Sequence, residues 1–140
     1  MKGIKFSVLA LLIGLLGTLP AFADISVIVN PNNNIELSAK EVRAIYLAKT
    51  NAFPSGDKVQ PLDINNNDEI KNKFSKDVLR KSPSSLNSYW SRMIFSAKGT
   101  PPQSLSMAAV KVKVANDKSA IGYIDSSMVD DSVRVVYSFD

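Results

Sequence analysis

The stretch Ala120-Ile121-Gly122-Tyr123-Ile124 (AIGYI) predicts a strand near the end of the chain. A second strand is predicted at Ser132–Phe139 (SVRVVYSF), where every second residue is apolar: Val133, Val135, Tyr137 and Phe139. A third is predicted at Asp24–Asn30 (DISVIVN), which ends at Pro31 and a polar loop. These three segments are therefore interpreted as strands.

A helix is predicted after residue 38, because Ser38 and Glu41 have the spacing of a capping box. Leu37 and Val42 are placed as a hydrophobic staple around it, and the helix should run to about Lys49. A short strand is then predicted at Lys58–Leu62.

Two further helices follow a polar run. Residues 63–69 (DINNNDE) lead into a helix that places Ile70, Phe74 and Val78 four apart. Ser82 is then a cap, followed by Pro83 at the first helical position. The apolar face of this last helix comprises Leu86, Tyr89, Trp90, Met93 and Ile94. Trp90 is interpreted as a core residue rather than as part of a binding surface.

The segment Met107–Asn116 fits two patterns. Val110, Val112 and Val114 alternate with lysines as in a strand, whereas Met107, Val110 and Val114 also have helical spacing. Either way, strands mixed with three or four helices predict one compact α/β domain.

The run after residue 62 has part of the pattern of a calcium loop. Asp63, Asn65 and Asn67 occupy positions one, three and five, but position six is Asp68 rather than glycine and position twelve is Phe74 rather than glutamate. Asn and Asp are preferred helix caps, so this run is interpreted as a capping loop.

The first 23 residues are typical of a signal peptide. Lys2 and Lys5 precede an uncharged apolar run from Phe6 to Leu19, and Ala21-Phe22-Ala23 offers a cleavage pattern. The run is shorter than the roughly twenty residues of a membrane span. An uncleaved anchor or a buried N-terminal helix are the alternatives. We therefore expect a signal peptide at 1–23, a domain at 24–140 and a periplasmic protein.

Composition excludes several classes of function. The chain has no Cys and no His, which removes disulfides, the usual zinc ligands and the Ser-His-Asp and Cys-His mechanisms. Beyond the predicted signal, the chain has 15 basic and 13 acidic residues, interleaved along the sequence. A nucleic-acid-binding domain would instead show a basic patch or stripe. We expect no enzyme activity, no cofactor, no bound metal and no nucleic-acid partner.

Four segments resemble the phosphate-type substrate-binding proteins of ABC transporters: residues 24–31 (DISVIVNP), 37–56 (LSAKEVRAIYLAKTNAFPSG), 89–102 (YWSRMIFSAKGTPP) and 119–125 (SAIGYID). Their order and spacing agree with the second lobe of such proteins. The resemblance implies a single lobe of a type 2 periplasmic-binding-protein-like fold, a central mixed sheet flanked by helices. It also implies a helix at Met107–Asn116, because the family has one before its AIGYI-like strand.

The chain departs from the family at the expected ligand site. Phosphate binders of this type place an arginine and a Ser-Gly-Thr turn at the strand-to-helix junction, where helix N–H groups hold the anion. Here the junction is residues 62–69 (LDINNNDE), which lack the arginine and the hydroxyls and include three carboxylates. Ala48 also replaces a family glycine, and Phe53 stands where the family usually has tryptophan.

Two groups of residues are candidates for ligand binding. Asn65, Asn66 and Asn67 occupy the family's junction. Arg92, Lys98 and Gly99 offer a guanidinium, an ammonium and room for close approach of an anion. Alternatively, Arg92 lies on a solvated face and pairs with a surface carboxylate.

Two functions follow from the resemblance. The first is an exported solute-binding-like protein that binds phosphate or another small anion weakly. The alternative is a ligand-free adaptor lobe that docks on an ABC transporter permease, a membrane sensor or a second copy of itself. The missing arginine and the acidic junction favour the alternative.

Overall fold

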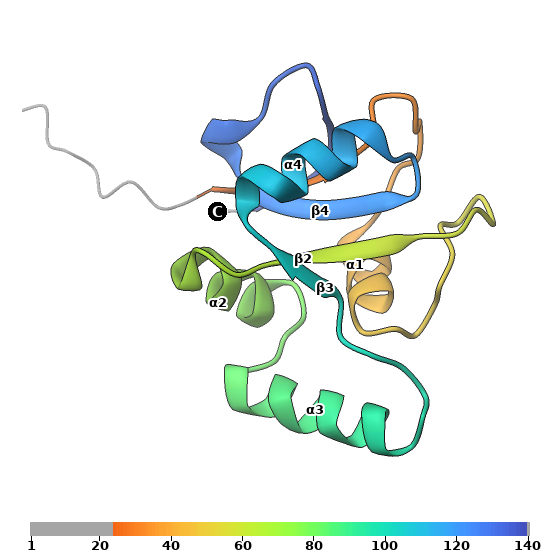
Figure 1. The fold of residues 1–140 in the computed structure, drawn as a ribbon, viewed down its shortest axis with the longest axis vertical. Coiled ribbons are helices and arrows are strands. Elements are labelled where there is room, and N and C mark those ends of the chain that lie inside the picture. The colour runs from red at the N-terminus through yellow and green to blue at the C-terminus, as the bar shows by residue number, and fades with distance from the viewer. Residues whose placement is uncertain (1–23, 140) are drawn as a thin grey trace, which may run out of the picture.

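The computed structural model describes residues 24–139 and contains one five-stranded mixed sheet in the order β3-β2-β4-β1-β5 (Figure 1). The parallel strands β3, β2 and β4 form one side, and β1 is antiparallel to both β4 and β5. The two ends of the described chain therefore pair, with Ile25 opposite Phe139. The strands are β1 (Ile25–Val29), β2 (Gln60–Ile64), β3 (Gln103–Leu105), β4 (Ala120–Asp125) and β5 (Arg134–Phe139).

The strand predictions were right in kind, with three differences. β5 begins at Arg134 rather than Ser132. β2 begins at Gln60 rather than Lys58 and extends to Ile64, because its last residues pair with β3. The three residues of β3 were not predicted: this edge strand has two exposed residues and no apolar alternation to reveal it. In contrast, β1 and β4 are buried along nearly their whole length, which explains why their apolar runs are readable.

The helix predictions are confirmed, including their caps, except that the helix after Ser38 ends at Tyr46 rather than at about Lys49. Ser38 and Glu41 form the predicted capping box, and Ser82 caps a helix that has proline in its first turn. Asn67 caps the helix after the polar run, as the capping-loop interpretation predicts. The helices are α1 (Ala39–Tyr46), α2 (Asp68–Asp77), α3 (Pro83–Phe95) and α4 (Met107–Asn116), with a short 3-10 turn, η1 (Ser126–Met128).

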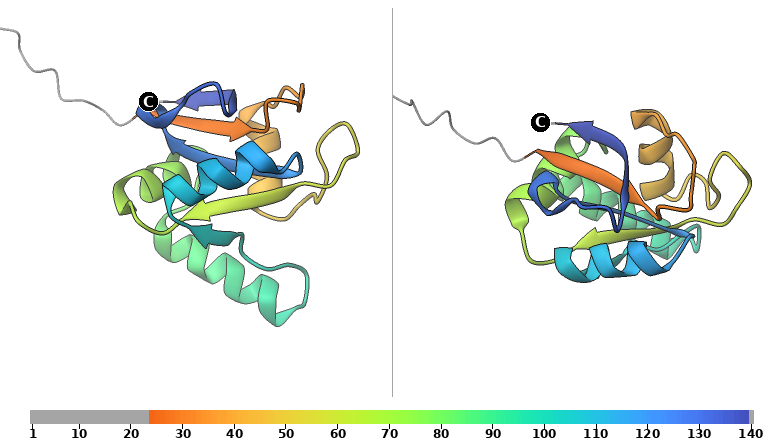
Figure 2. Two further views of the ribbon diagram at one scale, coloured as in Figure 1. Left: turned by 45° about the horizontal axis from the view of Figure 1, so that its top comes forward. Right: turned by 90° about the horizontal axis from the view of Figure 1, so that it is seen from above.

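Helices cover both faces of the sheet (Figure 2). Gly122 of β4 faces α4, since a Cβ added there would lie 2.3 Å from a Val110 methyl carbon. Neighbouring strand residues point to opposite faces. Tyr123 accordingly packs on the other side, stacked on Phe74 of α2 at 3.8 Å between ring centroids and edge-on to Tyr46 of α1. Gly122 thus permits the close contact of α4 with the sheet.

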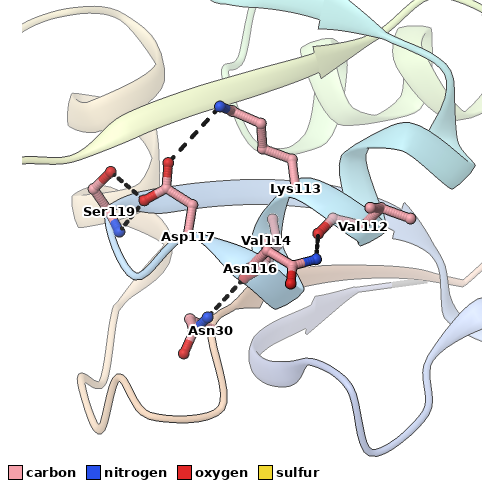
Figure 3. A network of polar contacts seen from close by, with 7 residues as sticks. All are labelled: Asn30, Val112, Lys113, Val114, Asn116, Asp117 and Ser119. Atoms are coloured by element: carbon pink, nitrogen blue, oxygen red, sulfur yellow. Dashed lines mark hydrogen bonds and ion pairs between the residues drawn. The ribbon is translucent and has the colours of Figure 1, made fainter.

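The turn between α4 and β4 is held by its own polar network (Figure 3). Asp117 accepts hydrogen bonds from the backbone N–H of Ser119 at 2.9 Å and from its hydroxyl at 2.7 Å, which lowers the pKa of that carboxyl. Buried Asn30, which follows β1, donates to the carbonyls of Val114 and Ala115. These bonds satisfy orphan carbonyls at the end of α4 and tie that helix to the segment after β1.

Helix α3 stands away from the sheet (Figure 1). Its inner side packs through buried Trp90, and the Tyr89 hydroxyl donates to the Leu47 carbonyl at 2.5 Å. The predicted apolar face is only partly right. Ile94 is 54% exposed, because no other described element covers the C-terminal turn of α3.

The signal peptide at 1–23 lies outside the described residues and stays a prediction, as does the export that depends on it. Within residues 24–139, no helix combines the length and apolarity needed to cross a membrane.

Candidate functional site

The expected ligand junction lies at one edge of the sheet. The parallel strands β2 and β3 end there, and α2 and α4 begin there, so two helix N-termini meet. The backbone N–H of Asn65 donates to the carbonyl of Leu105 at 2.9 Å, which ties the two strand ends together. Paired N-termini of this kind expose orphan N–H donors and a positive dipole end, which favour anions.

Side chains of the protein already occupy these donors. The Asn67 side-chain oxygen accepts from the N–H of Ile70 in α2 at 3.1 Å. In α4, Asn66 accepts from the N–H of Met107 at 3.0 Å, and the Ser106 hydroxyl accepts from Ala109 at 3.1 Å. An anion at either helix end would therefore have to displace a side-chain oxygen that is held in place by its own chain.

A carboxylate lies beside these caps. Asp63 accepts from the hydroxyl of Tyr123 and from the N–H of Ile64 at 2.8 Å, and it forms an ion pair with Lys71 at 3.7 Å. Burial, followed by the negative charge of Asp63, raises the pKa of Tyr123 above 10.0, and the same two causes raise that of Tyr46. Both phenols therefore stay protonated and act as hydrogen-bond donors.

The remaining acidic residues also have a structural explanation. Asp68 and Glu69 lie in the first turn of α2, where negative charge interacts favourably with the helix dipole. Of the three asparagines, only Asn65 has a side chain without a hydrogen bond to the described residues. The junction is thus a capped, acidic helix start, and its chemistry opposes an anion.

A cavity of about 80 Å³ lies behind the junction, between α2, α3 and the sheet. Asp63 and Lys71 lie at its polar side, and much of the remaining wall is apolar or aromatic, including Phe74, Trp90 and Tyr123. This lining includes no guanidinium group, and its hydroxyls, those of Tyr46, Ser75 and Tyr123, already donate hydrogen bonds within the chain.

The second candidate group lies elsewhere. Lys98 and Gly99 line a surface hollow of about 480 Å³ together with Lys49 and residues at the N-terminal side of β2, whereas the asparagines follow its C-terminal end. Arg92 does not line this hollow, and its guanidinium pairs with no carboxylate among the described residues. The six candidates are therefore not one site: three lie at the junction, two in the hollow and one on α3.

Gly99 has a packing role that the sequence did not reveal. A Cβ there would lie 3.1 Å from the Met93 terminal methyl and 3.2 Å from the Ala48 methyl. Ala48, which replaces the family glycine, has φ of 57°, the left-handed conformation that favours glycine. Ala48 is therefore in a conformation in which a side chain is strained.

Sequence reasoning missed three contributors to the junction: Tyr123, Lys71 and Ser106. Tyr123 could have been found, since alternation in AIGYI places it on the opposite face from Gly122. Ser106 precedes an ambiguous segment, so its capping role depended on knowing that a helix starts there. The pairing of Lys71 with Asp63 required the structure.

Comparison with known proteins gives a consistent class. No protein-family model matches the chain, and no curated protein matches it either. Among solved structures, it is similar to a protein from Clostridium perfringens assigned as a phosphate ABC transporter substrate-binding protein, with bound phosphate (TM-score 0.63, 21% identity). It is also similar to an ABC-type phosphate transport receptor from Vibrio cholerae (TM-score 0.61, 16% identity). Each match covers 81% of this chain but only 45% and 46% of those chains.

The α/β fold predicted from the resemblance is thereby confirmed: a five-stranded mixed sheet with helices that matches about half of a phosphate-binding protein, a single lobe. At these identities the likeness defines the fold. The chain spans less than half the length of the structures it matches, so their ligand and transport role do not pass to it directly.

Proposed function

We propose that this protein is an exported interaction module: a single lobe of the phosphate-binding-protein type that docks on a membrane component or on a second copy instead of carrying a ligand. Export is supported by the signal-like residues 1–23. The absence of Cys and His, together with non-enzymatic structural neighbours, supports a binding rather than a catalytic role.

The observation that carries this proposal is the occupied junction. Asn66 and Asn67 satisfy the donors that an anion would use, and Asp63 places a negative charge beside them. Two like charges 4 Å apart near a protein surface repel by about 4 kcal/mol. Phosphate would thus lose hydrogen bonds that the protein already makes and gain a repulsion.

The size of the match points the same way. Two-lobed binding proteins close around their ligand, which excludes water and strengthens polar contacts. This chain matches one lobe, so a ligand held at the junction would stay in contact with water unless a partner supplied the second wall. A lobe with a closed junction is better suited to contacts through its outer surface.

The test is a thermal-shift titration of the exported protein with inorganic phosphate. Saturation at a hundred times Kd would raise stability by about 2.7 kcal/mol, which is several degrees or more for a domain of this size. We expect a much smaller shift at 10 mM phosphate, on the order of one degree or less. A shift of several degrees that is lost in Asn66→Ala/Asn67→Ala, but kept in Asn65→Ala, would overturn the proposal.

A second candidate function, weak anion binding, is supported by the hollow beside Gly99. Lys49 and Lys98 line it together with two threonines, and no carboxylate is among its lining residues. If the small phosphate shift falls in Lys49→Ala and Lys98→Ala but not in the exposed control Lys40→Ala, this hollow is the anion site. No change in either variant rejects it.

A further inference from the structure

The outer face of α3 carries the most exposed large apolar side chain in the described chain. Phe95 is 95% exposed and Ile94 is 54% exposed, although Trp90 on the same helix is buried. Arg92 lies one turn before Phe95 on the outer face. Exposed Ser91 precedes Arg92, and exposed Ser96 follows Phe95. An apolar tip flanked by a cation is therefore presented to solvent.

The stretch of sequence that contains this tip carries charge of one sign. Between Asp77 and Asp117 the sequence contains no acidic residue, a gap that the interleaved charges of the whole chain conceal. The same interval holds six cations: Arg80, Lys81, Arg92, Lys98, Lys111 and Lys113.

Two of these cations are neutralised by other elements. In α4, Lys111 forms an ion pair with Asp130 at 2.5 Å, and Lys113 pairs with Asp117 at 3.8 Å. Lys81 lies over the ring of Tyr89, 4.9 Å from its centroid. No such pair neutralises Arg92 or Lys98 among the described residues, so α3 and the segment after it keep these two positive charges.

The free charges at the two ends of the molecule differ in sign. Helix α3 lies at one end, and the segment 126–133 lies at the other end beyond the sheet (Figure 1), where Asp130 is paired with Lys111 and exposed Asp131 is in no ion pair with the described residues. A charge distribution of this kind steers a protein so that its positive end meets a negative surface. It would point the Phe95 tip toward that surface.

We propose that α3 docks the protein on an anionic lipid surface, with Phe95 and Ile94 entering the headgroup region and Arg92 and Lys98 contacting lipid phosphates. This inference rests on the proposed interaction function and names its partner. A membrane fits better than a protein groove, because one protruding tip between small serines needs no complementary pocket. Aromatic side chains beside basic ones are typical of interfacial contacts.

The experiment is co-sedimentation of the protein with vesicles of phosphatidylglycerol and phosphatidylcholine, compared with vesicles of phosphatidylcholine alone. Binding is expected on the anionic vesicles and should weaken as salt is raised from 50 to 300 mM, by screening. Phe95→Ser should lower the partition coefficient about tenfold, and Arg92→Ser and Lys98→Ser by roughly fivefold each.

Matched controls keep the test specific. Val112→Ser removes a 63% exposed apolar side chain from α4, and Lys40→Ser removes an exposed cation from α1. Neither should change vesicle binding. Because Phe95 is almost fully exposed, its variant should keep the wild-type melting temperature, which shows that any loss of binding is not unfolding.

Three outcomes would overturn the inference: no binding to anionic vesicles, equal binding to both vesicle types, or anionic binding that Phe95→Ser leaves unchanged. The first would leave the interaction function intact, with an acidic protein as the remaining partner. Failure of the interaction function itself would instead appear as strong phosphate binding at the junction.

Discussion

The β2–α2 junction and the outer face of α3 are opposites. At the junction, Asn66 and Asn67 cap helix donors and Asp63 is bonded to Tyr123, so the polar groups are largely satisfied within the chain. On α3, Phe95 and Arg92 have no such partners among residues 24–139. At the junction, where the fold leads one to expect a ligand, the polar groups already have partners within the chain. On the outer face of α3, where the fold gives no such expectation, the exposed groups have no such partners among the described residues. Shared architecture therefore does not locate the functional surface.

The largest expected effect separates the two sides of α3. Trp90→Ala should lower the free energy of unfolding by roughly 3 kcal/mol, because it empties a buried site, whereas Phe95→Ala should leave it within about 0.5 kcal/mol. Denaturation followed by circular dichroism measures both, since Trp90 is the chain's single tryptophan. Similar losses in the two variants would mean that the outer face of α3 is covered.

The next effect concerns the junction and pH. Tyr123→Phe removes a hydrogen bond to a carboxylate, which should lower stability at pH 7 by about 2 kcal/mol. Tyr137→Phe is the control at this pH, because the Tyr137 hydroxyl bonds to no described group.

The direction in which stability changes at alkaline pH tests the same hydrogen bond. The folded protein raises the pKa of Tyr123 above 10.0, so above about pH 10 the unfolded chain loses this proton while the folded chain keeps it. Stability then falls as pH rises, by about 1.4 kcal/mol per pH unit for each such tyrosine. In urea denaturation between pH 10 and 11.5, the free energy of unfolding of Tyr123→Phe should fall with rising pH less steeply than that of the wild-type protein. The difference in slope should correspond to one proton. An unchanged slope would contradict the buried pairing with Asp63.

A smaller effect tests the caps themselves. Asn67→Ala should lower stability by about 1 kcal/mol, because it leaves the N–H of Ile70 without its partner. Asn65→Ala, whose side chain makes no such bond, should change it by less than about 0.5 kcal/mol. Equal effects in chemical denaturation would show that the junction is not closed by Asn67.

The smallest effect lies at the end of α3. Ala97 has φ of 55° just beyond the helix, where alanine costs about 1–2 kcal/mol and glycine does not. Ala97→Gly should raise the melting temperature. The free energy of unfolding should increase by about 0.5 kcal/mol after the backbone entropy of glycine is subtracted. Ala48, with φ of 57°, is in the same conformation, so Ala48→Gly should change stability in the same direction. A destabilised Ala97→Gly would contradict this conformation.

Most of the fold was predictable because its signals are local. The capping box of Ser38 and Glu41, the Ser82-Pro83 helix start and the apolar β1 and β4 runs involve neighbours in sequence. Met107–Asn116 was different: its valines fit both periods, and the resemblance rather than periodicity gave the correct helix. β3 was missed because three mostly exposed residues carry no pattern.

The sequence by itself determined the helix caps, the buried strands and the absence of Cys and His, since each depends on residue type and short spacing. Only the tertiary structure decided what the candidate residues do. It brought Asn66 to the start of α4, 41 positions away, and placed Tyr123 against Asp63 across 60 positions. It also left Phe95 uncovered while burying Trp90. The physical reason is that donors, charges and apolar surface acquire a function only when folding fixes which of them already have partners.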